Sequence, residues 1–175
     1  QEPGGDFRKT RVYDVRTHTL VSASIPSPDS DVFCAGHAFT SDGRLLIVGG
    51  TQAWSTGHGH DLAFWGHRRC WRYNARERQW VEAAQLLGDP NGDGSSGGGR
   101  WYPGALTLGS GDVLALFGHV AQDDSRHRNA APERYSPHAN AWTPRPKLAT
   151  DAATYAPHFG DLDVRFLFFT RTFQL

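Results

Sequence analysis

Short apolar runs separated by polar turns recur along the chain, and they predict strands joined by tight hairpins. The apolar runs Leu45–Val48 and Val113–Phe117 follow the turns Ser41–Gly43 and Ser110–Asp112, each of which contains the glycine that a two-residue hairpin needs. Because neither run alternates with polar residues, both faces of these strands are expected to be covered. The pattern predicts an all-β fold.

Aromatic hairpins repeat along the chain. The segment Tyr73–Trp80 is matched by Tyr135–Trp142, and in both copies the Tyr and the Trp are seven residues apart with a leucine six residues further on. A weaker third copy covers Tyr13–Leu20, where leucine takes the place of the tryptophan. A repeat of this length indicates a fold built from similar supersecondary units.

The buried hairpins repeat between the aromatic ones. His37–Gly50 resembles Gly104–Gly118, and His158–Phe169 is a degenerate third version. One unit therefore holds four strands, which is the composition of a propeller blade. The units exceed the roughly 50 residues of a kelch blade, and the excess lies in two predicted loops, Thr51–Gly66 and Gly88–Gly99.

The number of blades predicts an incomplete ring. Residues 1–175 are expected to form a single kelch-like segment with about three four-stranded blades, whereas propellers close with roughly four to eight. Other chains or further copies are therefore expected to complete the ring. The run Phe166–Leu175 stops after an apolar strand, which would leave an exposed edge, so we expect a truncation there.

Composition and charge remove some classes of partner. The chain has 18 Lys+Arg against 18 Asp+Glu, together with 20 Gly and 10 Pro, which favours strands and turns. A net charge of zero gives no electrostatic reason to expect nucleic acid. No apolar run approaches the roughly 18 residues of a membrane span, and Gln1–Thr10 lacks the apolar core of a signal peptide. Neither nucleic acid nor a membrane is the expected partner.

Cys34 and Tyr102 occupy equivalent places at the entrance to the two buried hairpins. Cys34 lies in Asp31–His37 before the first hairpin, and Tyr102 lies in Arg100–Gly104 before the second. Because the inner strands of successive blades lie side by side around the channel, the thiol and the phenol are expected to be neighbours. A buried cysteine can also be inert packing, and position alone leaves that alternative open.

The sequences around these two residues resemble the kelch propeller of the copper radical oxidases, the galactose oxidase and glyoxal oxidase enzymes. The likeness is carried by Val32–Phe39, Asp42–Gly50 and Gly99–Gly104, extends over Val12–His158, and is greater for the glyoxal oxidase-like branch. It implies a secreted, extracellular protein. The reaction that it implies is oxidation of a small primary alcohol, aldehyde or carbohydrate by dioxygen, with hydrogen peroxide as a product.

The resemblance also implies roles for the two residues. Cys34 would form a thioether bond with Tyr102, and Tyr102 would be the copper ligand and redox group. The other copper ligands of the family, a Tyr followed by a His and then a further His, lie in later blades and a C-terminal domain, so an incomplete site is expected here. The aromatic residue that stacks over the modified Tyr in galactose oxidase falls near His119–Val120, which supplies no indole.

Two other interpretations follow from the residues. His58, His60, His67 and Cys70 lie within thirteen residues of each other, and they are candidate ligands for zinc or copper, although their spacing matches no standard zinc knuckle. The second interpretation is that the chain belongs to a non-catalytic kelch module, which would bind a protein or a glycan through its long loops. A disulfide between Cys34 and Cys70 would exclude the thioether, but the strand context of Cys70 predicts too great a distance for that bond.

Overall fold

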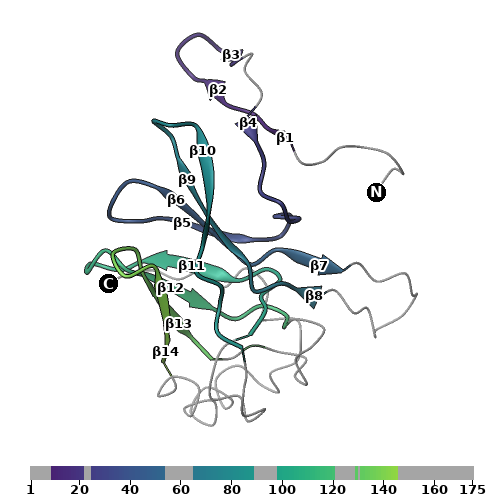
Figure 1. Cartoon of the computed structure of the whole chain (residues 1–175), viewed down its shortest axis with the longest axis vertical. Helices are drawn as coiled ribbons and strands as arrows, with labels where there is room; N and C mark the ends of the chain where they lie inside the picture. Colours follow the sequence, from purple (N-terminus) through teal and green to yellow (C-terminus); the bar gives the residue numbers. More distant parts are fainter. Residues whose placement is uncertain are drawn as a thin grey trace, which may run out of the picture.

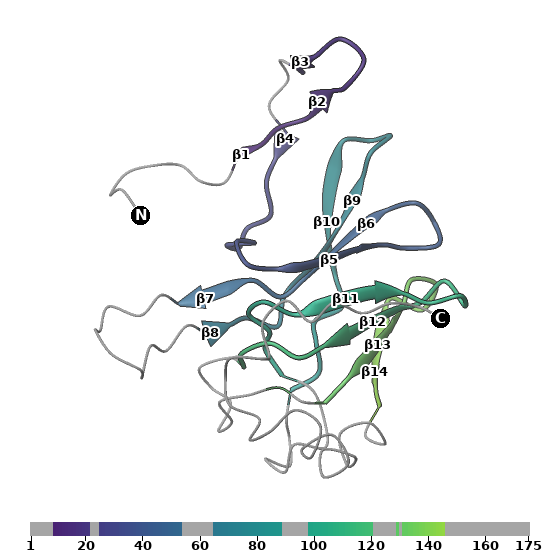
Figure 2. The same cartoon turned by 180° about the vertical axis from the view of Figure 1, so that it is seen from behind.

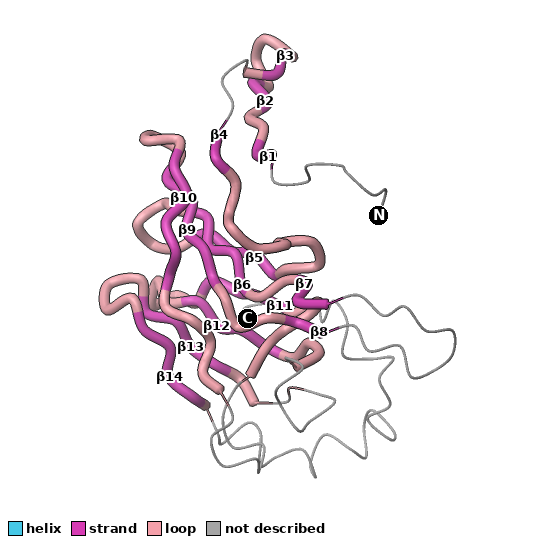
Figure 3. The backbone as a smooth tube through the Cα atoms, turned by 45° about the vertical axis from the view of Figure 1, so that its right-hand side comes forward, coloured by secondary structure: helices cyan, strands magenta, loops and turns pink. Residues whose placement is uncertain are grey.

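A computed structural model describes residues 9–21, 25–53, 65–88, 98–120, 129 and 131–145. Strands and loops make up these residues, as the tube in Figure 3 shows. Throughout the described ranges, no helix is long and apolar enough to cross a membrane. The predicted all-β class is confirmed. The predicted third hairpin, His158–Phe169, and the end Phe166–Leu175 lie outside the described residues.

Two four-stranded antiparallel sheets form the main body (Figure 1). The first sheet has the spatial order β5 (Gly36–Phe39), β6 (Leu45–Val48), β9 (Cys70–Asn74) and β10 (Gln79–Ala83). The second has the order β11 (Gly104–Thr107), β12 (Val113–Leu116), β13 (Glu133–Ser136) and β14 (Ala141–Pro144). The two sheets also share a register, because Leu45 pairs with Tyr73 in the first and Val113 with Tyr135 in the second. Each described unit has the four strands that the repeats predict.

Three two-stranded sheets accompany the main body. They pair β1 (Lys9–Thr10) with β4 (Ile25–Pro26), β2 (Tyr13–Asp14) with β3 (Thr19–Leu20), and β7 (Thr51–Ala53) with β8 (Trp65–Gly66). The β2–β3 hairpin projects away from the two larger sheets (Figure 2). Strands β7 and β8 correct the prediction of a loop over residues 51–66, because the two ends of that segment pair with each other while residues 54–64 lie outside the described ranges.

The aromatic repeat places a Tyr and a Trp directly opposite each other in a hairpin. Tyr73 pairs with Trp80 and Tyr135 pairs with Trp142, with ring centroids 4.9 Å and 5.1 Å apart. The weaker copy Tyr13–Leu20 forms the β2–β3 hairpin with the same pairing of its first and last residues. Cross-strand aromatic pairs stabilise such hairpins, which explains the seven-residue spacing in the sequence.

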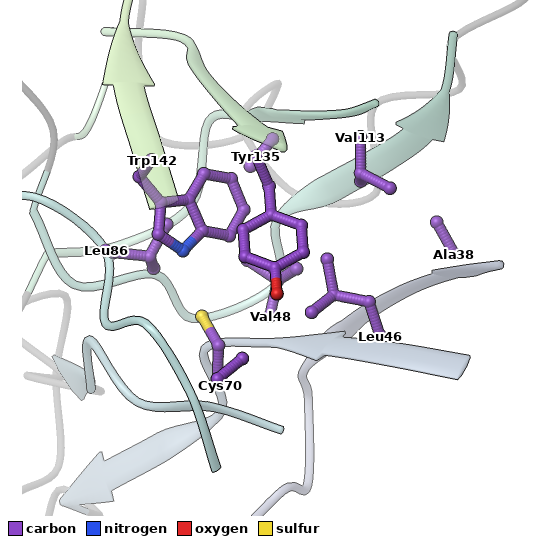
Figure 4. Close-up of a cluster of buried hydrophobic side chains, with 10 residues drawn as sticks. Ala38, Leu46, Val48, Cys70, Leu86, Val113, Tyr135 and Trp142 are labelled. Atoms are coloured by element: carbon purple, nitrogen blue, oxygen red, sulfur yellow. The ribbon is translucent and has the colours of Figure 1, made fainter. Parts of the chain in front are cut away.

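The hydrophobic core lies between the two main sheets (Figure 4). Leu46 and Val48 of β6 and Val113 of β12 are fully buried there, and the Tyr135 ring lies among them. Leu45 and Ile47 alternate with Leu46 and Val48 and remain only half-buried. Coverage on both faces was expected of this run, but only the face toward the second sheet is fully covered. A strand sequence does not encode which of its faces the next sheet covers.

Candidate functional site

Cys34 and Tyr102 lie side by side just before the first strands of the two sheets. The backbone N–H of Tyr102 donates to the carbonyl oxygen of Cys34 at 2.8 Å. Their side chains also share a hydrogen bond between the phenol and the thiol. The predicted proximity of the two residues is confirmed, while their chemical roles stay predictions.

Both residues have a left-handed backbone conformation. The φ angle is 62° at Cys34 and 59° at Tyr102, a region that residues other than glycine rarely adopt. Such a conformation costs of order 1–3 kcal/mol and persists only when the surrounding structure holds it in place. Four other described non-glycine residues share this conformation, so the pair is distinguished by the contact between two such residues and not by the conformation alone.

The thiol and the phenol both keep their protons at neutral pH. Burial raises the pKa of Cys34 above its ordinary value, although hydrogen bonds from the side chains of Tyr102 and Trp101 act in the opposite direction. The hydrogen bond to Cys34 raises the pKa of Tyr102, and burial adds to this effect. One side-chain hydrogen bond between the phenol and the thiol therefore acts on both groups, with opposite effects on their pKa values.

Cys70 lies in the hydrophobic core. It is fully buried among core residues, and its Sγ lies 3.7 Å from the carbonyl oxygen of Arg68. Burial raises the pKa of Cys70 to about 12, so its thiol keeps its proton at neutral pH. The role of Cys70 as a metal ligand stays a prediction. Cys70 and Cys34 are both free, so no disulfide competes with the predicted thioether.

The two cysteines are expected to differ strongly in reactivity toward an alkylating reagent. At pH 8, iodoacetamide should modify Cys34 slowly in the native protein and leave Cys70 unmodified until the protein unfolds. The rate at Cys34 should continue to rise above pH 9, because its raised pKa keeps the reactive thiolate scarce at lower pH. Peptide mass spectrometry follows both sites, and equal native rates at both would contradict this assignment.

Arg100 is a functional candidate that sequence reasoning missed. Its side chain is fully buried and forms an ion pair with the equally buried Glu133, Nη2 to Oε1, at 2.9 Å. Nη1 donates to the carbonyl oxygen of Phe117 at 2.7 Å, and Nη2 donates to that of Ala131 at 2.5 Å. Arginine is almost never fully buried unless it is paired. The position of Arg100 directly before Trp101 and Tyr102 is its one signal in the sequence.

Hydrogen bonds along residues 100–102 join several of the segments that connect the strands. The N–H of Arg100 donates to the carbonyl of His67 at 3.2 Å, and its own carbonyl accepts the N–H of Gly50 at 3.0 Å. Trp101 exchanges two backbone hydrogen bonds with His119, each of 2.9 Å. Tyr102 then bonds to Cys34, so every residue of this segment has a fixed backbone partner.

Trp101 supplies an indole beside Tyr102. The two ring centroids are 4.4 Å apart in an edge-to-face arrangement, and the Trp101 ring is 5.8 Å from that of His119. The indole Nε1 donates to Thr51 Oγ1 at 3.2 Å, and the Thr51 hydroxyl donates to the carbonyl of Phe33 at 2.8 Å. As expected, His119–Val120 supplies no indole, and the indole beside Tyr102 comes instead from the preceding residue, Trp101.

The hypothesis of a histidine-rich loop site rests on residues that are only partly described. His58 and His60 lie outside the described residues. His67 is described, and its Nε2 donates to the carbonyl oxygen of Asp31 at 3.1 Å. Among the residues that the structure describes, no three His, Cys, Asp or Glu side chains are grouped to hold a metal ion. The loop site with His58, His60, His67 and Cys70 therefore stays a prediction.

His67 is expected to make stability fall in mild acid. Its burial lowers its pKa below the ordinary value of 6.5, so between the two values the unfolded chain binds a proton that the folded protein does not. The free energy of unfolding should therefore decrease as the pH falls below about 6.5. Urea unfolding at pH 8, 6 and 5 measures this decrease. His67→Gln should make this loss of stability smaller, whereas His37→Gln, at an exposed position, should leave it unchanged. If the free energy of unfolding falls equally with pH in all three proteins, His67 is not its cause.

Comparisons with known proteins bear on the fold. No family model and no curated protein sequence matches this chain. A solved structure described as a novel fungal alcohol oxidase with catalytic diversity among the AA5 family, in complex with copper, matches with a TM-score of 0.52 and 21% sequence identity. The match covers 77% of this chain and 23% of that chain, so the present chain corresponds to less than a quarter of the oxidase. At this identity, the comparison shows that the chain shares its fold with part of an alcohol oxidase.

Proposed function

We propose that this chain is part of a kelch-type β-propeller of a copper radical oxidase-like protein, in which Cys34 and Tyr102 are joined by a thioether. The observation that carries the proposal is the contact between these two residues, whose backbones and side chains are both hydrogen-bonded. Their left-handed conformations add support. The fold shared with a copper-containing alcohol oxidase is consistent with it.

The arrangement of the strands supports the propeller. In each sheet the strands follow one another in space in the order of the sequence, as they do in a blade. The first strands of the two sheets, β5 and β11, approach closely, since a Cβ atom built on Gly36 would lie 2.9 Å from the Pro103 carbonyl oxygen. Successive blades with neighbouring inner strands generate a ring, which other chains or copies of this one would complete.

The described residues fit copper only in part. The Tyr102 oxygen is a suitable ligand, because Cu(II) accepts oxygen and imidazole donors. Within the described ranges, however, there is no group of three His, Cys, Asp or Glu side chains to complete a site. The remaining ligands therefore have to come from outside the described residues. When bound, copper would supply the one-electron redox partner of the modified tyrosine.

Formation of the proposed thioether would be a two-electron oxidation of this pair. A bond forms between Cys34 Sγ and the ring carbon next to the Tyr102 hydroxyl, while the S–H bond and that C–H bond break. Dioxygen accepts the two electrons and two protons and becomes hydrogen peroxide. The sulfur substituent makes the phenol easier to oxidise, which suits Tyr102 to redox chemistry.

The proposed reaction is the oxidation of a primary alcohol or aldehyde, free or within a carbohydrate. Two electrons and two protons leave an alcohol to give the aldehyde, and dioxygen is reduced to hydrogen peroxide. An aldehyde would react as its hydrate and give the acid with the same balance. Within this chain, Tyr102 would hold and release the proton at Oη, and Trp101 would shield the ring beside it. We also propose that the protein acts outside the cell.

The proposal is tested by treating the reduced protein with Cu(II) in air and measuring its intact mass after reduction and denaturation. The wild type should lose two hydrogens. Cys34→Ser and Tyr102→Phe should each prevent this loss, whereas Cys70→Ser should retain it, because Cys70 lies in the core. An unchanged wild-type mass would favour a non-catalytic kelch module that binds a protein or a glycan.

A further inference from the structure

We propose that Arg100 is a positioning residue, whose ion pair with Glu133 fixes the backbone of Tyr102 beside Cys34. The importance of this role rests on the proposed function, because Cys34 and Tyr102 form the site of that function. The geometric claim itself concerns only the position of Tyr102, and it is measurable in the absence of copper.

The guanidinium of Arg100 is anchored to the second sheet. It binds the Glu133 carboxylate and the carbonyl oxygens of Phe117 and Ala131. Glu133 is held in turn, because its Oε2 accepts the backbone N–H of Leu87 at 2.7 Å. Leu87 follows the last strand of the first sheet, so this one carboxylate connects both sheets. A planar fork with several donors fits such a set of acceptors better than an ammonium group does.

The backbone of Arg100 is anchored at the same time to the residues at the base of the β7–β8 hairpin. Gly50 and His67 provide its two hydrogen bonds, and Gly66 packs so closely that an added Cβ would lie 2.0 Å from the Arg100 carbonyl carbon. Tyr102 is only two residues further along the chain. The backbone is thus held at Arg100 and again at Tyr102, where the N–H donates to the Cys34 carbonyl oxygen. These two restraints hold Tyr102 in its left-handed conformation.

A purely structural ion pair would have a different signature. Breaking it would lower the protection of all core amides to a similar degree, as a core cavity does. A positioning role instead predicts that Tyr102 loosens while the strands of the core stay protected. The amide of Tyr102 reports on this directly, because it donates to the Cys34 carbonyl.

The test is amide hydrogen exchange measured by NMR on the full chain. Arg100→Lys keeps the positive charge but lacks the planar set of N–H donors of the guanidinium. The double variant Arg100→Met with Glu133→Leu removes both charges. In both variants, exchange at Tyr102 should accelerate at least tenfold relative to the Val48 amide of strand β6. Leu46→Ala is the matched control, because it makes a core cavity while it keeps both charged groups, and it should leave that ratio unchanged.

The wild type provides a second measurement if a variant fails to fold. In low concentrations of denaturant, the amides of Leu87 and Tyr102 should open with the same free energy, because the Glu133–Arg100 pair connects them. Independent opening of these amides, or an unchanged exchange ratio in the folded variants, would overturn the proposal. If the Leu87 and Tyr102 amides of the wild type open with the same free energy but no thioether forms, only the proposed function is refuted.

Discussion

Replacing Arg100 by methionine is expected to lower the free energy of unfolding by about 3–5 kcal/mol, because it leaves the buried Glu133 without its charge partner. The carbonyl oxygens of Phe117 and Ala131 also lose their donor, and an unsatisfied buried acceptor adds to the loss. Urea unfolding followed by circular dichroism measures the difference. Because most exposed substitutions change stability by less than about 0.5 kcal/mol, this effect should be easy to distinguish.

A double-mutant cycle separates the ion pair from the packing of the two side chains. Arg100→Met combined with Glu133→Leu should be less destabilised than the sum of the single variants, with a coupling of about 0.5–3 kcal/mol. The recovery should be incomplete, since the carbonyl oxygens of Phe117 and Ala131 remain unpaired. Strictly additive effects would mean that the two charged groups do not stabilise each other.

Gly66→Ala is expected to destabilise the fold by about 3 kcal/mol or more, because overpacking forces the backbone to move. An added Cβ would lie 2.0 Å from both the Arg100 carbonyl carbon and the Trp101 nitrogen. Both neighbours are backbone atoms, so no side chain can rotate away to make room. The change should lower the urea concentration at the midpoint of unfolding. It should also shift the backbone of Tyr102, which directly follows Arg100 and Trp101.

Gly43→Ala is the matched control for this prediction. Gly43 has a φ of +76° and no atom within 4 Å of an added Cβ. The alanine there should cost only about 1 kcal/mol from the left-handed backbone conformation. Equal losses at the two positions would show that the crowding at Gly66 is relieved at little cost.

Local repeats made much of the fold predictable. The seven-residue spacing of Tyr and Trp and the glycine turns before each apolar run indicated the hairpins, and both four-stranded sheets follow that pattern. These features depend on neighbours in the sequence. The pairing of Thr51 with Gly66 was not predictable in this way, because the intervening residues carry no turn signal that fixes which ends meet.

The candidate site was predictable at Cys34 and Tyr102 and not around them. Their equivalent positions before two similar hairpins led to the expectation that they meet. Arg100 and Glu133 come from segments that are 33 residues apart, and nothing in either segment indicates the other. Neither residue is a glycine, so the local sequence carries no signal for the left-handed backbones of Cys34 and Tyr102.

The most direct test of the central claim is to map the bond between Cys34 and Tyr102 after treatment with Cu(II) in air. Trypsin cleaves after Arg and Lys, so Cys34 is expected in peptide Thr17–Arg44 and Tyr102 in peptide Trp101–Arg126. The account predicts one species that contains both peptides, lacks two hydrogens and survives reduction. Fragmentation should place the bond between the Cys34 sulfur and the Tyr102 ring. Recovery of the two peptides as separate, unmodified species would contradict the thioether and the oxidase-like function that rests on it.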